Sequence, residues 1–157
     1  MEIISTLLIS AAVVAIISLI RYVWKRRAFG RIMAEFAGVA PYYDEIISRY
    51  FMYYNRLSSE AKQKFLFRTF LFKKSKKFHY VEISESPEMP VLISAVAVQL
   101  TLGLDKYLLN YFRNIYVLRE DYHYGHYSMP FMGHVDRSGI YLSWDNFLKG
   151  VEKASSP

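Results

Sequence analysis

The sequence predicts an α+β protein, in which an N-terminal transmembrane helix precedes a small domain of about four helices and a small three-stranded sheet. Two observations predict this class. Residues 3–20 form an 18-residue run without a charged side chain. Farther along, segments with apolar residues at every third or fourth position alternate with short β-branched and aromatic runs, as helices and strands do. The 157 residues are enough for one domain of this kind.

The apolar run 3–20 predicts a membrane anchor. As a helix it would be about 27 Å long, close to the roughly 30 Å of a bilayer core. Basic residues follow it at Arg21, Lys25, Arg26 and Arg27. The positive-inside rule then predicts an anchor over residues 1–27, the N-terminus outside, residues 28–157 in the cytoplasm and the lipid bilayer as a partner. A cleaved signal peptide and a buried or interfacial helix are the alternatives, and the first normally has a basic start and a small-residue cleavage site.

The first part of the folded domain is predicted to hold two helices. Pro41 is placed for the first turn of a helix, and apolar residues then recur at helical spacing over residues 43–57. Ser58 and Ser59 offer an N-cap for the second helix. Because this helix is apolar nearly all round over residues 65–72, we expect it to be deeply buried.

The second part is predicted to mix strands and helices. Short β-branched and aromatic runs predict three strands, over residues 78–83, 115–118 and 140–143. The apolar run 91–102 is too short to cross a membrane and predicts a buried helix that starts at Pro90. Residues 122–133 contain Gly and Pro and predict a loop, and residues 145–151 predict a short helix.

Composition excludes several functional classes. The chain has no Cys, so it has no disulfide, thiolate metal site or Cys nucleophile. Of the net charge of +6, residues 1–31 carry +4 (five basic, one acidic) and residues 32–157 carry +2 (15 basic, 13 acidic). This balance does not predict nucleic-acid binding. The motifs HExxH, GxSxG and GxGxxG are all absent.

A weak candidate for a metal site lies in the predicted loop. His123 and His126 are three positions apart, with Asp121 and His134 nearby. Imidazole and carboxylate groups suit zinc. A spacing of three fixes no geometry in a loop, however, so an exposed loop without metal is the alternative.

Residues 61–81 contain seven basic side chains and no acidic one, and the series ends with Lys73, Lys74, Lys76 and Lys77. Three interpretations are open: a solvated helix end that complements its own dipole, a surface for anionic lipid and a surface for nucleic acid. The predicted anchor favours lipid over nucleic acid. Together with Arg21, Lys25, Arg26 and Arg27, these four lysines are the candidate membrane-surface residues.

Three segments resemble the MtfA-like zinc-dependent peptidases. Residues 92–103 followed by 111–118 are similar to the apolar helix, connector and strand in the middle of that family. The stretch from Gly139 through Ser143, Trp144 and Asp145 is similar to its "G-x-I-x-L-S-W" segment. The helix that begins with Leu-Ser at residues 57–58 resembles its "L-S-x-x-x-x-x-F-x-x-R" helix. The resemblance covers about residues 50–150.

The resemblance implies the front half of a zinc peptidase that is catalytically silent by itself. In that family the HExxH helix follows the Ser-Trp segment, where this sequence ends with Ser-Ser-Pro. No catalytic residue or zinc ligand can therefore be carried over, and the zinc of the complete family has no counterpart in this chain. The implied partner is a separately encoded C-terminal half or another protein. A membrane-tethered module that binds protein or lipid, with no catalytic role, is the alternative.

The resemblance also singles out a candidate substrate strand or scaffold, made of Ile140, Tyr141, Leu142, Ser143 and Trp144. Its position just before the expected zinc helix suggests an edge strand to which an extended peptide could add. This hypothesis requires that residues 140–142 lie at the edge of the sheet.

Overall fold

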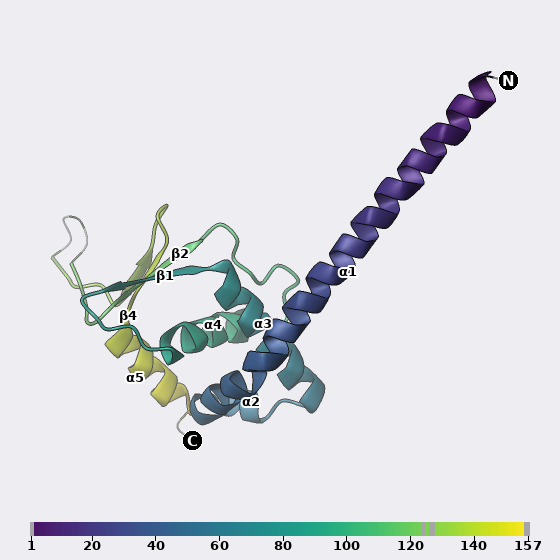
Figure 1. Cartoon of the computed structure of the whole chain (residues 1–157). Helices are drawn as coiled ribbons and strands as arrows, with labels where there is room; N and C mark the ends of the chain where they lie inside the picture. Colours follow the sequence, from purple (N-terminus) through teal and green to yellow (C-terminus); the bar gives the residue numbers. More distant parts are fainter. Residues whose placement is uncertain (1, 124, 126–127, 156–157) are drawn as a thin grey trace. The chain divides into compact units, whose positions relative to one another are not determined.

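The computed structural model describes the backbone of residues 2–123, 125 and 128–155, and the side chains of residues 14–123, 125 and 128–152. The chain divides into two units, Met1–Val39 and Ala40–Pro157. The described residues of the first unit all belong to helix α1 (Glu2–Tyr50), and the second unit contains the end of α1 and every other element (Figure 1).

No helix in the described part of the chain is long and apolar enough to cross a membrane. The described side chains of α1 begin at Val14. Residues 3–13 of the predicted anchor lie outside the described side chains. The N-terminal transmembrane helix is therefore unsupported, and the predicted single-pass topology with a cytoplasmic domain is contradicted.

The helices that open the second unit differ from prediction at their ends. Pro41 lies inside α1 and does not begin a helix. The predicted helix over residues 43–57 is interrupted at Phe51, whose extended backbone separates α1 from the short α2 (Met52–Asn55). Helix α3 (Ser59–Ser75) begins as expected, because the Ser58 hydroxyl accepts a hydrogen bond from the Ala61 N–H at 3.3 Å.

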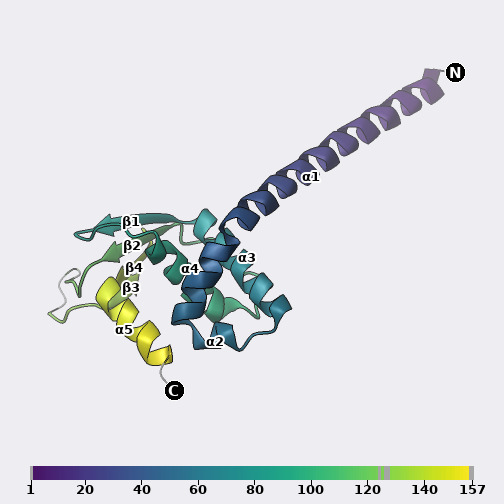
Figure 2. The same cartoon turned by 60° about the horizontal axis from the view of Figure 1, so that its bottom comes forward.

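The sheet has four strands in the order β1-β2-β4-β3 (Figure 2). Strands β1 (Lys77–Val81), β2 (Asn114–Leu118) and β4 (Ile140–Ser143) are parallel, and they confirm the three predicted strands. The fourth strand, β3 (Gly133–Val135), pairs antiparallel with β4 and was not predicted. The fold is thus α+β with a mixed sheet of four strands, where three were expected.

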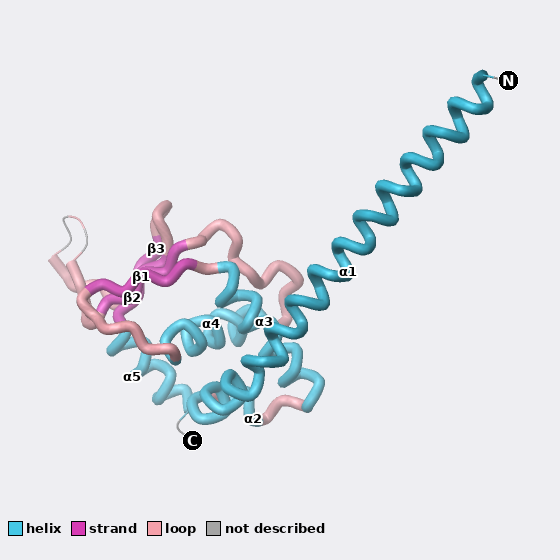
Figure 3. The backbone as a smooth tube through the Cα atoms, viewed as in Figure 1, coloured by secondary structure: helices cyan, strands magenta, loops and turns pink. Residues whose placement is uncertain are grey.

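Helix α4 (Glu88–Thr101) connects β1 to β2, and α5 (Trp144–Ser155) follows β4 directly. Helices α3 and α4 pack together on one side of the sheet (Figures 1 and 3). Strand β2 alternates accordingly: Ile115 and Val117 are 1% and 0% exposed, whereas Tyr116 between them faces the other side. The predicted burial of α3 is confirmed by Phe65, Phe70 and Phe72.

A tight turn fixes the register of β3 on β4. The Asp136 carboxylate accepts hydrogen bonds from the backbone N–H groups of Ser138 (2.8 Å) and Gly139 (3.2 Å). A side chain at Gly139 would collide with the backbone oxygen of Asn114, at the start of β2. Glycine is therefore required there by close packing between strands.

Candidate functional site

One ring from each strand forms a continuous stack across the sheet. His79 stacks on Tyr116 with ring centroids 4.7 Å apart, and both Tyr116 on Tyr141 and Tyr141 on His134 are 4.4 Å apart. The strand register places the four residues side by side. Since Tyr116 faces away from α3 and α4, this aromatic ladder lies on the other face of the sheet. Cross-strand ring pairs of this kind stabilise a sheet.

The geometry of the ladder does not suit nucleotide binding. Sheets that bind single-stranded nucleic acid offer ring faces on which bases stack. Here the faces of Tyr116 and Tyr141 are covered by neighbouring rings, with interplanar angles of 18° or less. The far end is also occupied, because Phe131 contacts His134 edge to face at 5.9 Å. The ladder is therefore a structural feature of the sheet.

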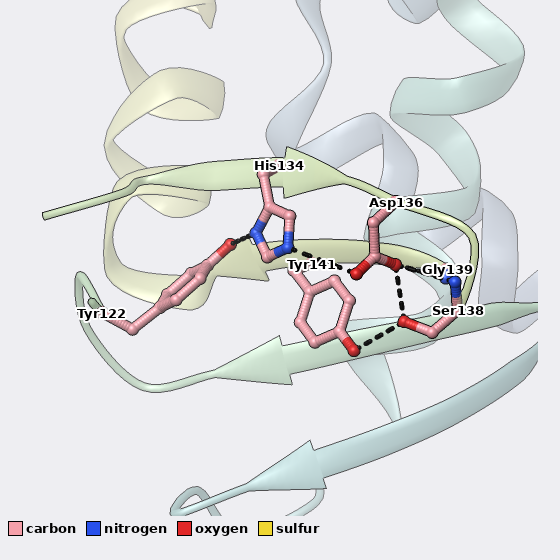
Figure 4. Close-up of polar contacts among 6 residues, drawn as sticks. All are labelled: Tyr122, His134, Asp136, Ser138, Gly139 and Tyr141. Carbon is pink, nitrogen blue, oxygen red and sulfur yellow. Dashed lines mark hydrogen bonds and ion pairs between the residues drawn. The ribbon is translucent and has the colours of Figure 1, made fainter. Parts of the chain in front are cut away.

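A polar cluster surrounds the His134 end of the ladder (Figure 4). The Tyr122 hydroxyl lies 2.7 Å from His134 Nδ1, and His134 Nε2 lies 3.9 Å from an Asp136 oxygen. Burial raises the pKa of Tyr122 to about 12, with smaller contributions from Tyr141 and Asp136. The phenol is thus protonated at neutral pH, and its hydroxyl shares a hydrogen bond with Nδ1. The Tyr122–His134 hydrogen bond therefore ties Tyr122 to strand β3.

The described residues do not form a site for the zinc that the family resemblance implies. His123 is exposed, and His126 lies outside the described residues. Within the described part of the chain, no three His, Asp or Glu side chains are close enough together to hold a metal ion. Zinc sites in proteins have three or four protein ligands, so no step of metal chemistry can be assigned to these residues.

The candidate substrate strand is central in the sheet. Ile140, Tyr141 and Leu142 pair with β2 on one side and with β3 on the other. Their backbone hydrogen bonds are already made, so no extended peptide can add there. The edge-strand hypothesis for residues 140–142 is therefore wrong, and the edges of the sheet are β1 and β3.

Ser143 and Trp144 have structural roles at the junction of β4 and α5. Ser143 is 1% exposed, and its hydroxyl accepts hydrogen bonds from the backbone N–H and the side-chain amide of Asn146. It is thus the cap of α5. Trp144 stacks on Phe147 with ring centroids 5.2 Å apart.

Two basic residues of the 61–81 stretch are used inside the fold. Lys76 is 8% exposed, and its ammonium donates to the carbonyl oxygens of Leu108, Leu109 and Phe112 at 2.5–2.9 Å. Burial lowers the pKa of Lys76. Arg68 donates to the carbonyl oxygens of residues 101, 102 and 104, at the end of α4. Lys76, expected at a membrane surface, is therefore unavailable to a lipid.

The other candidate membrane-surface residues lie nearer solvent. Arg21, Lys25, Arg26 and Arg27 are exposed on α1. Lys74 and Lys77 are exposed at the end of α3 and the start of β1, and Lys73 is half-buried. Lys74 also lies over the Phe70 ring at 5.6 Å. The helix-end interpretation accounts for Lys73 and Lys74, which are in the last turn of α3.

An open apolar groove of about 330 Å³ lies between α2, α4 and α5. Its walls are mainly apolar and include Phe51, Met52, Val96, Leu100, Phe147 and Val151. Leu100 is 79% exposed and Met52 is 38% exposed, so both offer apolar surface to solvent. The sequence did not predict this groove, because its walls come from three separate helices. We call it the α2–α4–α5 groove.

Comparisons of the chain with models of protein families, with curated proteins and with solved structures found no match.

Proposed function

We propose that residues 40–157 form a catalytically silent scaffold that holds an amphipathic helix in the α2–α4–α5 groove. The occupant we propose is a zinc-binding HExxH helix of the MtfA-like type, supplied by another polypeptide segment. The observation that carries the proposal is the open groove itself, which has apolar walls and an exposed leucine at its rim. Its α5 wall directly follows the Ser143–Trp144 junction, behind which the resemblance places the HExxH helix.

The shape and chemistry of the groove favour a helix as the occupant. Amphipathic helices bind apolar grooves through side chains at positions i, i+3, i+4 and i+7. The exposed side chain of Leu100 and the ring of Phe147 can contact such a row from two sides. Burying exposed leucine surface against a partner lowers the free energy by about 25 cal/mol for each Å² removed from water.

The order of elements also supports the proposal. The segments that resemble the peptidase family fall on α3, α4 with β2, and β4 with α5, in that order. The chemistry would come from the occupant, since this sequence contains no HExxH. The scaffold would then contribute the sheet and the apolar support for the occupant.

The first test starts at the gene. The region after codon 157 is sequenced and searched for a frame that encodes HExxH, and its product is co-expressed with the full chain. We expect a stable complex that binds zinc and hydrolyses an unstructured peptide substrate, whereas the full chain alone does neither. An unrelated neighbouring sequence, or a product that does not bind, argues against an HExxH partner.

A pair of variants tests whether the groove is the docking site. Leu100→Glu places a charge on its rim, and because residue 100 is exposed the change in folding stability should stay within about 0.5 kcal/mol. We expect at least a tenfold loss of affinity for the co-expressed helix. Leu104→Glu is the matched control, because Leu104 is 56% exposed and outside the groove. Equal affinities of the two variants would exclude this groove as the site.

A second candidate is a protein-binding module without any link to a peptidase. The same groove favours it, since an apolar groove selects a helix by its apolar face whether or not the helix carries metal ligands. A partner that binds the wild type but not Leu100→Glu, and whose complex holds no zinc, would support this candidate over the first.

A further inference from the structure

A basic hollow lies where α3 ends, β1 begins and the chain enters β2. It measures about 470 Å³ and is lined by Lys74, Ser75, Lys76, Lys77, Asn110 and Arg113. No acidic side chain is among these residues. We call it the basic hollow.

The sheet brings the cations together from distant parts of the sequence. The Lys77 N–H donates to the Arg113 carbonyl oxygen at 2.9 Å, just before β1 pairs with β2. Both side chains are exposed. In the described part of the chain, neither the Lys77 ammonium nor the Arg113 guanidinium forms an ion pair or a side-chain hydrogen bond. Two cations therefore flank the hollow without an internal counter-charge.

The Lys76 ammonium offsets the partial negative charge of three carbonyl oxygens beside the hollow. The carbonyl oxygens of Leu108, Leu109 and Phe112 carry partial negative charge and would repel an anion nearby. The Lys76 ammonium binds all three. The loop that carries them is also strained, because Leu109 has a left-handed φ of +46°. Such strain persists only where the surrounding structure enforces it, and it is common at binding sites.

We propose that the basic hollow binds a phosphate group of a ligand. The guanidinium of Arg113 can contact two phosphate oxygens at once. Lys77 and Lys74 add point charges from the other side, and the Asn110 side chain adds an amide donor. The hollow is large compared with the roughly 30 Å³ of one water, so it has room for a phosphate with part of its ester. The phosphate could belong to a soluble ligand or to a lipid headgroup.

Two probes applied to the full chain distinguish these sources. Pyrophosphate binding is measured by calorimetry at low salt, and vesicle binding is measured by sedimentation with phosphatidylcholine alone or mixed with phosphatidic acid. Saturable pyrophosphate binding supports a soluble ligand. Binding to phosphatidic acid vesicles with weak pyrophosphate binding supports a lipid headgroup. No binding of either probe overturns the proposal.

Matched double variants assign the binding to the basic hollow. Lys77→Ala with Arg113→Ala should weaken binding roughly tenfold to hundredfold, as expected for lost charge-assisted hydrogen bonds. The control, Arg56→Ala with Lys64→Ala, removes the same charges at exposed sites outside the hollow and should bind nearly as the wild type does. Equal weakening in both pairs overturns the proposal. Arg113→Lys keeps the positive charge but loses the planar guanidinium that can contact two phosphate oxygens at once. We expect its affinity to lie between that of the wild type and that of the double variant. This single variant also keeps the proposal testable if the double variant folds poorly.

Discussion

The β1–β2 half of the sheet and the β4–β3 half are packed to different degrees, although both belong to one continuous sheet. Ile115 on β2 is 1% exposed, whereas Ile140, its partner on β4 and on the same face, is only half-buried. Val135, the next residue along this row on β3, is 54% exposed. The core is therefore closed over β2, whereas the same row is half-buried at Phe78 on β1 and at Ile140 on β4.

The difference shows where the apolar side of the sheet is fully buried and where it stays partly exposed. In the first half, apolar burial and the buried Lys76 hold the structure. In the second half, the aromatic ladder and the Tyr122–His134 hydrogen bond stabilise strands whose helix-facing side is partly open. This partly open side is distinct from the α2–α4–α5 groove, which is lined by no residue of β3 or β4.

The largest expected effect compares the two halves at paired positions. Ile115→Ala should destabilise the chain by about 2–5 kcal/mol, because it opens a cavity in a closed core. Ile140→Ala should cost only about 1 kcal/mol, since that site is already partly hydrated. Urea unfolding of the full-length variants measures both. Equal losses would show that the two sites are equally packed.

A smaller effect is expected from the buried cation of the first half. Lys76→Met keeps most of the apolar stem but leaves three carbonyl oxygens without their donor, at a cost of about 1–3 kcal/mol. Lys77→Met, at the exposed neighbour, should change the free energy of unfolding by less than about 0.5 kcal/mol. Thermal unfolding of both variants is the measurement. If the two variants melt alike, Lys76 does not hold the 108–112 segment.

The elements that the sequence predicted are those with a strong local pattern. Strands β1, β2 and β4 and helices α3 and α4 show it in their alternation or helical spacing. Strand β3 has three residues, too few for a pattern, and is fixed by the turn at Asp136 and Gly139. Pro41 signalled a helix start by its residue type alone, but the helix continues through it.

Most of the proposed binding surface could not be predicted from the sequence, because it depends on long-range contacts. Nothing local distinguishes Lys76 from Lys74 or Lys77, since its carbonyl partners lie 32–36 residues away. The basic hollow similarly depends on the pairing of β1 with β2. The position of residues 140–142 in the sheet was predicted wrongly for the same reason. Strand β3, which pairs with their outer edge, is too short to show a pattern in the sequence.

The smallest effect concerns the hydrogen bond that supports the open half. Tyr122→Phe removes the hydroxyl that shares a hydrogen bond with His134 and should cost about 0.5–1.5 kcal/mol at neutral pH. The folded-state pKa of Tyr122 is raised to about 12 from the ordinary value of 10.0. The wild-type advantage is therefore fully present below pH 10, and it decreases as the pH rises toward 12 and the phenol ionises.

Urea unfolding at a series of pH values measures this decline as the difference between wild type and Tyr122→Phe. Because Tyr54, whose pKa burial also raises, is present in both proteins, the difference isolates Tyr122. Tyr111→Phe is the control, since Tyr111 is 76% exposed and its loss should cost less than about 0.5 kcal/mol at neutral pH. A Tyr122→Phe difference that stays constant from pH 10 to 12 would mean that burial does not raise the pKa of Tyr122, and that the phenol is exposed to solvent at this end of the sheet.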